Sequence, residues 1–122
     1  MAFSGRTPAA SERRWLDAIT RLGCIACLLD LYVWSEPSPH HTVGKTKPGA
    51  HYLTIPLCWR HHQAGDDCAE YTSRHPHKAR FEARYGAEAE LIQATLDRIG
   101  GSLDEQARRF FIDQGFVLEV AA

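Results

Sequence analysis

The chain has 122 residues, of which 44% are apolar, and a formal net charge of −1 at pH 7. This length suits one small domain with a limited core, and no apolar run approaches the roughly 18 residues that span a bilayer, so we expect a soluble protein. Residues 1–80 hold ten Lys and Arg against seven Asp and Glu, whereas residues 81–122 hold four against eight. Attraction for nucleic acid phosphates is therefore expected in the first part, although a net charge of +3 is far below that of a high-affinity DNA binder.

The first half of the chain predicts one helix followed by a hairpin. Apolar residues at helical spacing indicate an amphipathic helix over residues 8–22, which Gly23 ends. The pair of cysteines that follows indicates a tight turn. Prolines and glycines then interrupt the chain as far as residue 57, so only short strands fit, at 40–43 and 51–57.

The second half is predicted to be helical. We expect helices over residues 59–64, 76–85 and 87–99. A capping-box pattern that begins at Ser102 opens a last helix, which Gly115 ends. The tail over residues 116–120 is compatible with a strand.

Two pairs of potential metal ligands have the spacing that structural zinc uses, Cys24-x-x-Cys27 and Cys58-x-x-His61. The first residues do not resemble a secretion signal, so we expect a cytosolic protein, in which such cysteines bind metal more often than they form disulfides. The alternative, buried thiols beside an unrelated histidine, is disfavoured because both pairs have ligand spacing. Cys68 has no partner at that spacing and is expected to be a small buried apolar residue.

Further histidines indicate a second, open site. Adjacent residues of a strand point to opposite faces, so His40 and His41 cannot both bind one ion, but one can bind while the other acts as a base. A helix turns by about 100° per residue, so His61 can complete the zinc site while His62 faces the strand.

A third ligand of this open site is expected from His75, with Asp66 as the alternative. Taken alone, His75 and His77 are better interpreted as solvated loop histidines. The neighbouring cluster changes that interpretation for His75 and hardly for His77.

These residues resemble the HNH, or ββα-metal, nuclease motif, in which a hairpin and a following helix carry a metal site and a catalytic histidine. Within that superfamily the chain most resembles the phage recombination enhancement function (Ref) group of RecA-dependent nucleases, over roughly residues 10–92. The strings that carry the resemblance are Arg21-Leu22-Gly23-Cys24-Ile25-Ala26-Cys27, Pro39-His40-His41-Thr42, the block from His51 through Thr54-Ile55-Pro56-Leu57-Cys58 to His61-His62, and Phe81-Glu82-Ala83-Arg84-Tyr85-Gly86.

The resemblance implies an α+β fold, in which a small zinc-stapled ββα-metal (HNH) finger is embedded among several α-helices. It would form one nuclease-like domain over residues 1–122. An N-terminal arm and helix (1–23) would precede the zinc-bound core (24–86), and an acidic helical extension (87–122) would follow.

The resemblance also implies roles for single residues. His41 would be the general base that activates water, and His40, His62 and His75 would bind a catalytic divalent metal, Mg²⁺, Mn²⁺ or Zn²⁺. The ligands of the structural zinc would be Cys24, Cys27, Cys58 and His61. The side chains expected to contact DNA are Lys45, Lys47 and Arg60.

The chain departs from the family pattern in two places. It contains no Asn, and His51 stands roughly where the central Asn of the motif is expected, either to position His41 or to contact phosphate. The long basic N-terminal arm of the Ref protein is also missing, since that region offers only Arg6, Arg13 and Arg14. We therefore expect weak, salt-sensitive DNA binding, with targeting supplied by a RecA filament if one is used.

The predicted function is that of a metal-dependent DNA endonuclease of HNH type, which acts on single-stranded or RecA-coated DNA during phage or prophage recombination in the bacterial cytoplasm. A noncatalytic zinc module that binds nucleic acid or protein is the alternative, but it leaves His40, His41 and His62 unexplained. A zinc hydrolase for small substrates is disfavoured because the chain has no HExxH string.

Overall fold

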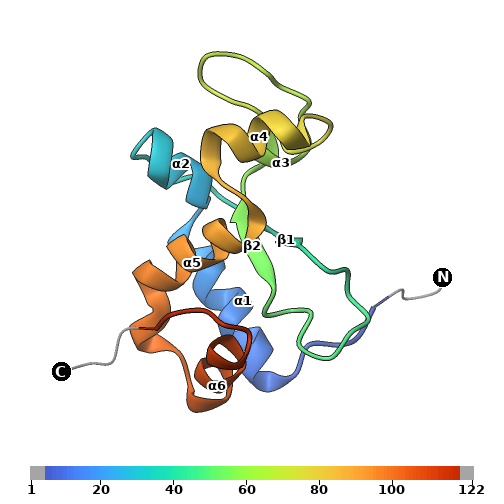
Figure 1. The fold of residues 1–122 in the computed structure, drawn as a ribbon, viewed down its shortest axis with the longest axis vertical. Coiled ribbons are helices and arrows are strands. Elements are labelled where there is room, and N and C mark those ends of the chain that lie inside the picture. The colour runs from blue at the N-terminus through green and yellow to red at the C-terminus, as the bar shows by residue number, and fades with distance from the viewer. Residues whose placement is uncertain (1–4, 119–122) are drawn as a thin grey trace.

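The computed structural model describes residues 5–118 and has an α+β fold, with a two-stranded sheet among several helices (Figure 1). The elements, in chain order, are α1 (Ala10–Leu22), α2 (Ile25–Asp30), β1 (Ser38–His41), β2 (Thr54–Leu57), α3 (Trp59–His62), α4 (Lys78–Tyr85), α5 (Glu88–Ile99), the 3-10 turn η1 (Gly100–Ser102) and α6 (Glu105–Asp113). Among the described residues, no helix combines the length and the apolar character that a membrane crossing requires.

Helix α1 forms close to the predicted position and supplies one wall of the core. Trp15 and Ile19 lie one helical turn apart and are buried, as the apolar spacing predicts. The carboxylate of Glu12 accepts a hydrogen bond of 2.9 Å from the backbone N–H of Ala9, which satisfies one of the free donors at the helix start. The helix ends where Gly23 takes a positive φ of 95°.

Helix α2 was predicted only as a tight turn. The sulfur of Cys24 accepts the backbone N–H of Cys27 at 3.5 Å, so that this cysteine caps the helix as a serine would. The helix then continues to Asp30, and its six residues are too few for a helical period to show in the sequence.

The sheet is an antiparallel hairpin that is shorter than predicted. β1 pairs with β2 so that His40 lies opposite Ile55 and His41 lies opposite Thr54. β1 begins and ends two residues before the predicted span of 40–43. The predicted span of 51–57 narrows to Thr54–Leu57, since the preceding residues form turns in which the N–H of Tyr52 donates to the carbonyl of Gly49.

The core is built around β2. All four residues of this strand are buried, and the strand contacts α1, α2, α3 and α5 (Figure 1). The indole N–H of Trp15 donates to the hydroxyl of Thr54 at 2.8 Å, which satisfies two buried polar groups within the core.

The last helices pack against the same core. Helices α4 and α5 form near the predicted spans, and Leu91, Ile92 and Leu96 of α5 are buried. The predicted cap of α6 is wrong, because Asp104 caps it by accepting the N–H of Ala107, whereas the serine at 102 lies in η1. The tail is compatible with a strand, but residues 116–118 do not form one, and residues 119–120 lie outside the described part of the chain.

Candidate active site

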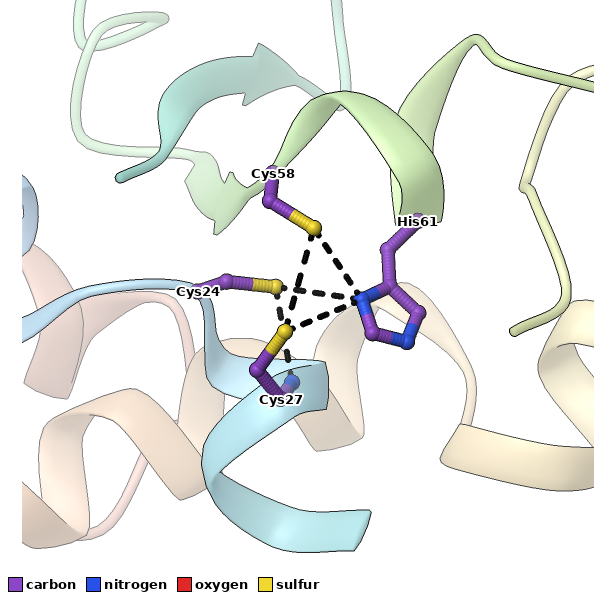
Figure 2. Close-up of side chains that lie close together, drawn as sticks. All are labelled: Cys24, Cys27, Cys58 and His61. Carbon is purple, nitrogen blue, oxygen red and sulfur yellow. Dashed lines mark hydrogen bonds between the residues drawn. The ribbon is translucent and has the colours of Figure 1, made fainter. Parts of the chain in front are cut away.

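Four potential zinc ligands meet where α2 faces the start of α3 (Figure 2). The Nδ1 atom of His61 lies between 3.3 and 3.5 Å from each of the three sulfur atoms, and the sulfurs of Cys27 and Cys58 are 3.8 Å apart. All four residues, including Cys24, are buried. The two ligand pairs lie 30 residues apart in the sequence, yet the fold brings them together as their spacing predicts.

The geometry fits a tetrahedral zinc ion. Zinc binds sulfur at about 2.3 Å and nitrogen at about 2.0–2.1 Å, so tetrahedral ligand atoms would be separated by roughly 3.8 Å for two sulfurs and roughly 3.6 Å for sulfur and nitrogen. The observed separations agree with both values within a few tenths of an ångström. This buried Cys₃His group can therefore hold a structural zinc.

Neighbouring hydrogen bonds orient the ligands. The Nε2 atom of His61 lies 3.0 Å from the hydroxyl of Tyr85, so a proton on Nε2 would leave Nδ1 free to bind metal. The hydroxyl of Ser35 donates to the sulfur of Cys27 at 3.1 Å. Neither Tyr85 nor Ser35 was predicted as part of the site, because they lie 24 and 8 residues from the ligands that they contact and no local spacing pattern indicates either contact.

The electrostatics of the cluster favour a bound cation. The hydrogen bond with Cys58, together with burial, raises the pKa of the Cys24 thiol, and burial raises the pKa of Cys27. Without a cation, three close and buried sulfurs cannot all be thiolates. Zinc would supply the compensating positive charge, and its binding would release protons.

Cys68 does not belong to this group. It is exposed, with its sulfur 3.6 Å from a carboxylate oxygen of Glu70. The prediction that it is a small buried residue is therefore wrong. It lies in the segment between α3 and α4, which has little apolar sequence to cover it.

Three histidines form a second group beside the first. The Nδ1 atom of His40 lies 3.1 Å from the Nε2 atom of His62, and one ring nitrogen of His75 completes a set whose atoms all lie within 4.8 Å of one another. His40 comes from β1 and His62 from the last position of α3. The helical rotation between His61 and His62 thus directs them into different groups, as predicted.

Backbone hydrogen bonds bring His75 to this place. The N–H of Arg74 donates to the carbonyl of His61, and that of His75 donates to the carbonyl of His62, both at 2.9 Å. The chain therefore returns from its loop to run alongside α3. The alternative ligand, Asp66, instead accepts a 2.8 Å hydrogen bond from the guanidinium of Arg60.

Glu88 supports the histidine trio, and sequence reasoning missed it. Its Oε2 atom lies 3.0 Å from Nε2 of His40 and also accepts a 2.8 Å bond from the buried guanidinium of Arg74. A carboxylate on one nitrogen of an imidazole fixes the proton there and leaves the other nitrogen free for a metal. Glu88 begins α5, 48 residues beyond His40, and no local pattern indicates the contact.

His41 lies on the other side of the strand and contacts His51. Its Nε2 atom is 2.9 Å from Nδ1 of His51, whose Nε2 is 2.7 Å from the backbone carbonyl of Arg6. That carbonyl can only accept, so His51 donates from Nε2, and a neutral His51 must accept at Nδ1. The proton of this hydrogen bond is then carried by Nε2 of His41, so Nδ1 of His41 remains as an acceptor.

The start of α1 holds His51 in turn. The N–H of His51 donates to the buried carboxylate of Glu12 at 3.3 Å. Glu12 therefore joins the helix cap to the loop before β2, a link between residues 39 positions apart that the sequence does not reveal.

The pKa values of His41 and His62 favour neutral imidazoles. Burial lowers the pKa of His41 to about 4, with further contributions from His51 and Lys45. Burial, followed by the neighbouring His40 and His75, lowers the pKa of His62 to about 4. Neutral imidazole is the form that can accept a proton or bind a metal ion.

An open groove of about 550 Å³ adjoins His40, His41 and His62. Its other lining residues come from the approach to β1, the hairpin loop and α3: Glu36, Pro37, Ser38, Pro39, Lys45, Trp59 and Gln63. Of the three side chains predicted to contact DNA, Lys45 is among the lining residues, whereas Lys47 and Arg60 are not. The guanidinium of Arg60 stacks on the ring of Tyr71. DNA binding by these three residues remains a prediction.

The family comparison agrees with the resemblance found in the sequence. A family model described as recombination enhancement, RecA-dependent nuclease matches residues 8–99, which are 92 of the 122 residues. The matched part contains both ligand groups, the pair of His41 and His51, and Glu88. The chain therefore belongs to the family of recombination enhancement, RecA-dependent nucleases.

Proposed function

We propose that the protein is a metal-dependent DNA endonuclease of HNH type, which hydrolyses phosphodiester bonds during recombination. One observation carries this proposal. Two histidines of the trio gathered for metal binding, His40 and His62, border the same open groove as His41, a separate histidine with a free acceptor nitrogen. A metal site and a nearby base are the two components that metal-assisted hydrolysis requires.

The two ligand groups would hold different metals. The Cys₃His group suits a structural zinc because its four ligands leave no open position. The trio of His40, His62 and His75 supplies three ligands and leaves space for water and substrate. Imidazole nitrogens favour Zn²⁺ and other transition metals over Mg²⁺, which prefers oxygen ligands, so we expect Zn²⁺ or Mn²⁺ to bind this trio more tightly than Mg²⁺.

The protein residues would activate water as follows. The Nδ1 atom of His41 accepts a proton from water, whose oxygen forms a bond to phosphorus as the bond from phosphorus to the 3′ oxygen breaks. The leaving oxygen then takes a proton from solvent. A metal ion on the histidine trio would polarise the phosphate and stabilise the charge that develops on the leaving oxygen.

His51 would act as a positioning residue for His41. Its hydrogen bond fixes the tautomer in which Nδ1 of His41 is free, and the carbonyl of Arg6 fixes His51 in turn. This is the orienting task predicted for the residue that replaces the central Asn of the motif. Of the two roles predicted for His51, the contact with His41 favours positioning over phosphate binding.

DNA and RecA are the proposed partners. The family description names nucleases that depend on RecA. The chain has a small net charge, so electrostatic attraction alone would give weak, salt-sensitive binding to DNA. A RecA filament would then supply targeting, with Lys45, Lys47 and Arg60 as the proposed phosphate contacts of the nuclease.

The decisive experiment compares the wild type with His41→Ala in the nicking of single-stranded and RecA-coated DNA with Mn²⁺ or Mg²⁺. We expect the variant to lose about 10²- to 10⁴-fold in rate, the usual contribution of a general base. His77→Ala is a matched control, because His77 contacts the carbonyl of Gly65 and lies outside both ligand groups. Equal cleavage by wild type and His41→Ala would remove His41 from this role.

Metal counting separates the nuclease from a noncatalytic zinc module. The nuclease requires one tightly held zinc in the Cys₃His group and a second divalent ion that His62→Ala would release. A single zinc per chain, with no second ion bound to the wild type at millimolar Mn²⁺, would favour the module.

A further inference from the structure

Trp59 has an exposed ring at the edge of the proposed active site. Its side chain is 64% exposed, although indole is among the largest apolar groups that a protein can bury. It is the first residue of α3 and directly follows the zinc-ligand candidate Cys58. Within residues 5–118, Trp59 takes part in none of the aromatic or cation–π pairs that the structure contains. Much of its ring is therefore available to a ligand.

The position of Trp59 relative to the histidine trio is fixed. Residues three and four positions apart lie on the same side of a helix, so Trp59 shares one side of α3 with His62 and Gln63. All three line the groove that also contains His41. Because Cys58 and His61 anchor α3 to the Cys₃His group, the indole cannot move far from the histidines.

The groove combines apolar and polar side chains. Pro37 and Pro39 line it together with Trp59, and its histidines, His40, His41 and His62, come from β1 and α3. Glu36 and Lys45 contribute one charge of each sign, so the groove carries little net attraction for a phosphate backbone. A ligand that offers a flat apolar face to Trp59 therefore matches the groove better than a charged backbone alone.

We propose that Trp59 is a stacking platform for an unpaired nucleobase next to the phosphodiester bond that is cleaved. This inference rests on the proposed function and specifies its substrate as DNA that is single-stranded at the cleavage position. In a duplex, both faces of each base are covered by neighbouring bases. In a single strand, a face of a base can be free. Stacking on an indole tolerates any sequence because every base has such a flat face.

The first test measures the binding of dye-labelled oligodeoxythymidylate by the full-length chain. Every protein in this test also carries His41→Ala, which prevents cleavage. We expect Trp59→Leu to weaken binding by about 5- to 100-fold, the usual effect of losing one base–aromatic stack. Trp59→Phe should retain most of the affinity because it keeps a ring. Trp34→Phe is the matched control, since Trp34 is 58% exposed but does not line the groove.

Comparison with duplex DNA distinguishes stacking from a structural effect. Binding of a duplex of the same length should be the same with and without Trp59→Leu, and the zinc content of each variant verifies that the fold is intact. An equal loss on single-stranded and duplex DNA would overturn the inference. So would unchanged binding of free single strands combined with a loss only on RecA-coated DNA, which would make Trp59 a protein contact.

A cleavage experiment distinguishes this inference from the proposed function. One abasic nucleotide beside the cleaved bond should slow cleavage by the wild type and have little further effect on Trp59→Leu. If the wild type cleaves DNA and Trp59→Leu has the same KM, the stacking inference is wrong and the nuclease stands. If the wild type cleaves nothing but single-strand binding still depends on Trp59, the proposed chemistry fails while the stacking site stands.

Discussion

Glu88 connects the histidine trio to the rest of the protein. A single oxygen of its carboxylate contacts both His40 and the guanidinium of Arg74. Arg74 is buried, and its Nε atom has no hydrogen-bond partner among residues 5–118, so its positive charge depends on this carboxylate for compensation. Glu88 therefore orients a proposed metal ligand and also neutralises a buried cation.

The exchange Glu88→Gln tests this arrangement. We expect the affinity of the trio for Mn²⁺ to fall by about 10- to 100-fold, the usual cost of removing a carboxylate that orients a histidine ligand. Titration calorimetry with Mn²⁺ on zinc-loaded protein measures this affinity. Glu90→Gln is the matched control, because Glu90 lies on the same helix and an amide at this position still accepts the N–H of Ala87. Equal Mn²⁺ affinities for Glu88→Gln and Glu90→Gln would show that Glu88 does not orient the site.

The neighbouring residues His40 and His41 show how much of the site can be predicted from the sequence at the scale of one residue. The strand period predicts that His40 and His41 separate, and the structure places one beside His62 and the other beside His51. The contacts of Glu88 could not be predicted in this way, because a carboxylate at a helix start is common and its partner lies far away along the chain. Local periodicity gives the direction of a side chain but not what it meets.

Helix α3 is short, yet it contributes to every part of the proposed site. Cys58 and His61 face the Cys₃His group, His62 faces β1, and Trp59 lines the groove. Four residues cannot form a stable helix alone, because an isolated helix of fewer than about 12 residues is marginal in water. The position of α3 therefore depends on its neighbours, above all on the group that joins it to α2.

Loss of one zinc ligand should accordingly disturb the whole site. We expect Cys58→Ser to lose its zinc at neutral pH, to lower the thermal midpoint and to weaken Mn²⁺ binding by the neighbouring trio, since α3 loses its anchor. Metal analysis and thermal unfolding measure the first two effects. Cys68→Ser removes a cysteine that is exposed and outside the group, so its zinc content and midpoint should match the wild type. A Cys58→Ser variant that keeps wild-type stability would contradict the role of the cluster as the anchor of α3.

Short elements also limit what sequence can predict. The helices of eight or more residues, α1, α4, α5 and α6, were all expected near their observed positions, because each spans two turns or more of apolar spacing. Helix α2 was missed, β1 was placed two residues late, and β2 was started three residues early although its end at Leu57 was correct. In these short elements the limits are set by tertiary contacts, such as the sulfur of Cys24 at the start of α2.

At the scale of the whole molecule, the first and last helices, α1 and α6, pack against each other. Asp104, at the start of α6, accepts hydrogen bonds from Ser11 and Arg14 of α1, both at 2.8 Å. The ring of Phe111 lies 4.8 Å from that of Trp15, which itself bonds to β2. Helix α6 lies beyond the part that the family model matches, yet it contributes directly to the core around the site.

The adjacent residues Phe111 and Ile112 offer a matched test of this packing. Phe111 is fully buried against Trp15 and Tyr52, whereas Ile112 on the same helix is 51% exposed. We expect Phe111→Ala to lower the free energy of unfolding by about 3–5 kcal/mol, because truncation of a buried ring loses its transfer free energy and leaves a cavity. Ile112→Ala should change it by less than about 1 kcal/mol, since much of its side chain stays in water. Urea unfolding of zinc-loaded protein measures both values.

The same pair distinguishes a shared core from an appended helix. If α6 belongs to the core that positions β2, Phe111→Ala should shift one cooperative transition, followed equally by tryptophan fluorescence and by zinc release. If α6 were an independent attachment, Phe111→Ala would unfold α6 more easily but would leave zinc release at the urea concentration found for the wild type. Trp15 connects α6 to the sheet. Its ring contacts Phe111, and its N–H donates to Thr54, the first residue of β2, which leads to Cys58. A single transition therefore requires that the contact between Phe111 and Trp15 and the metal cluster stabilise the same folded unit.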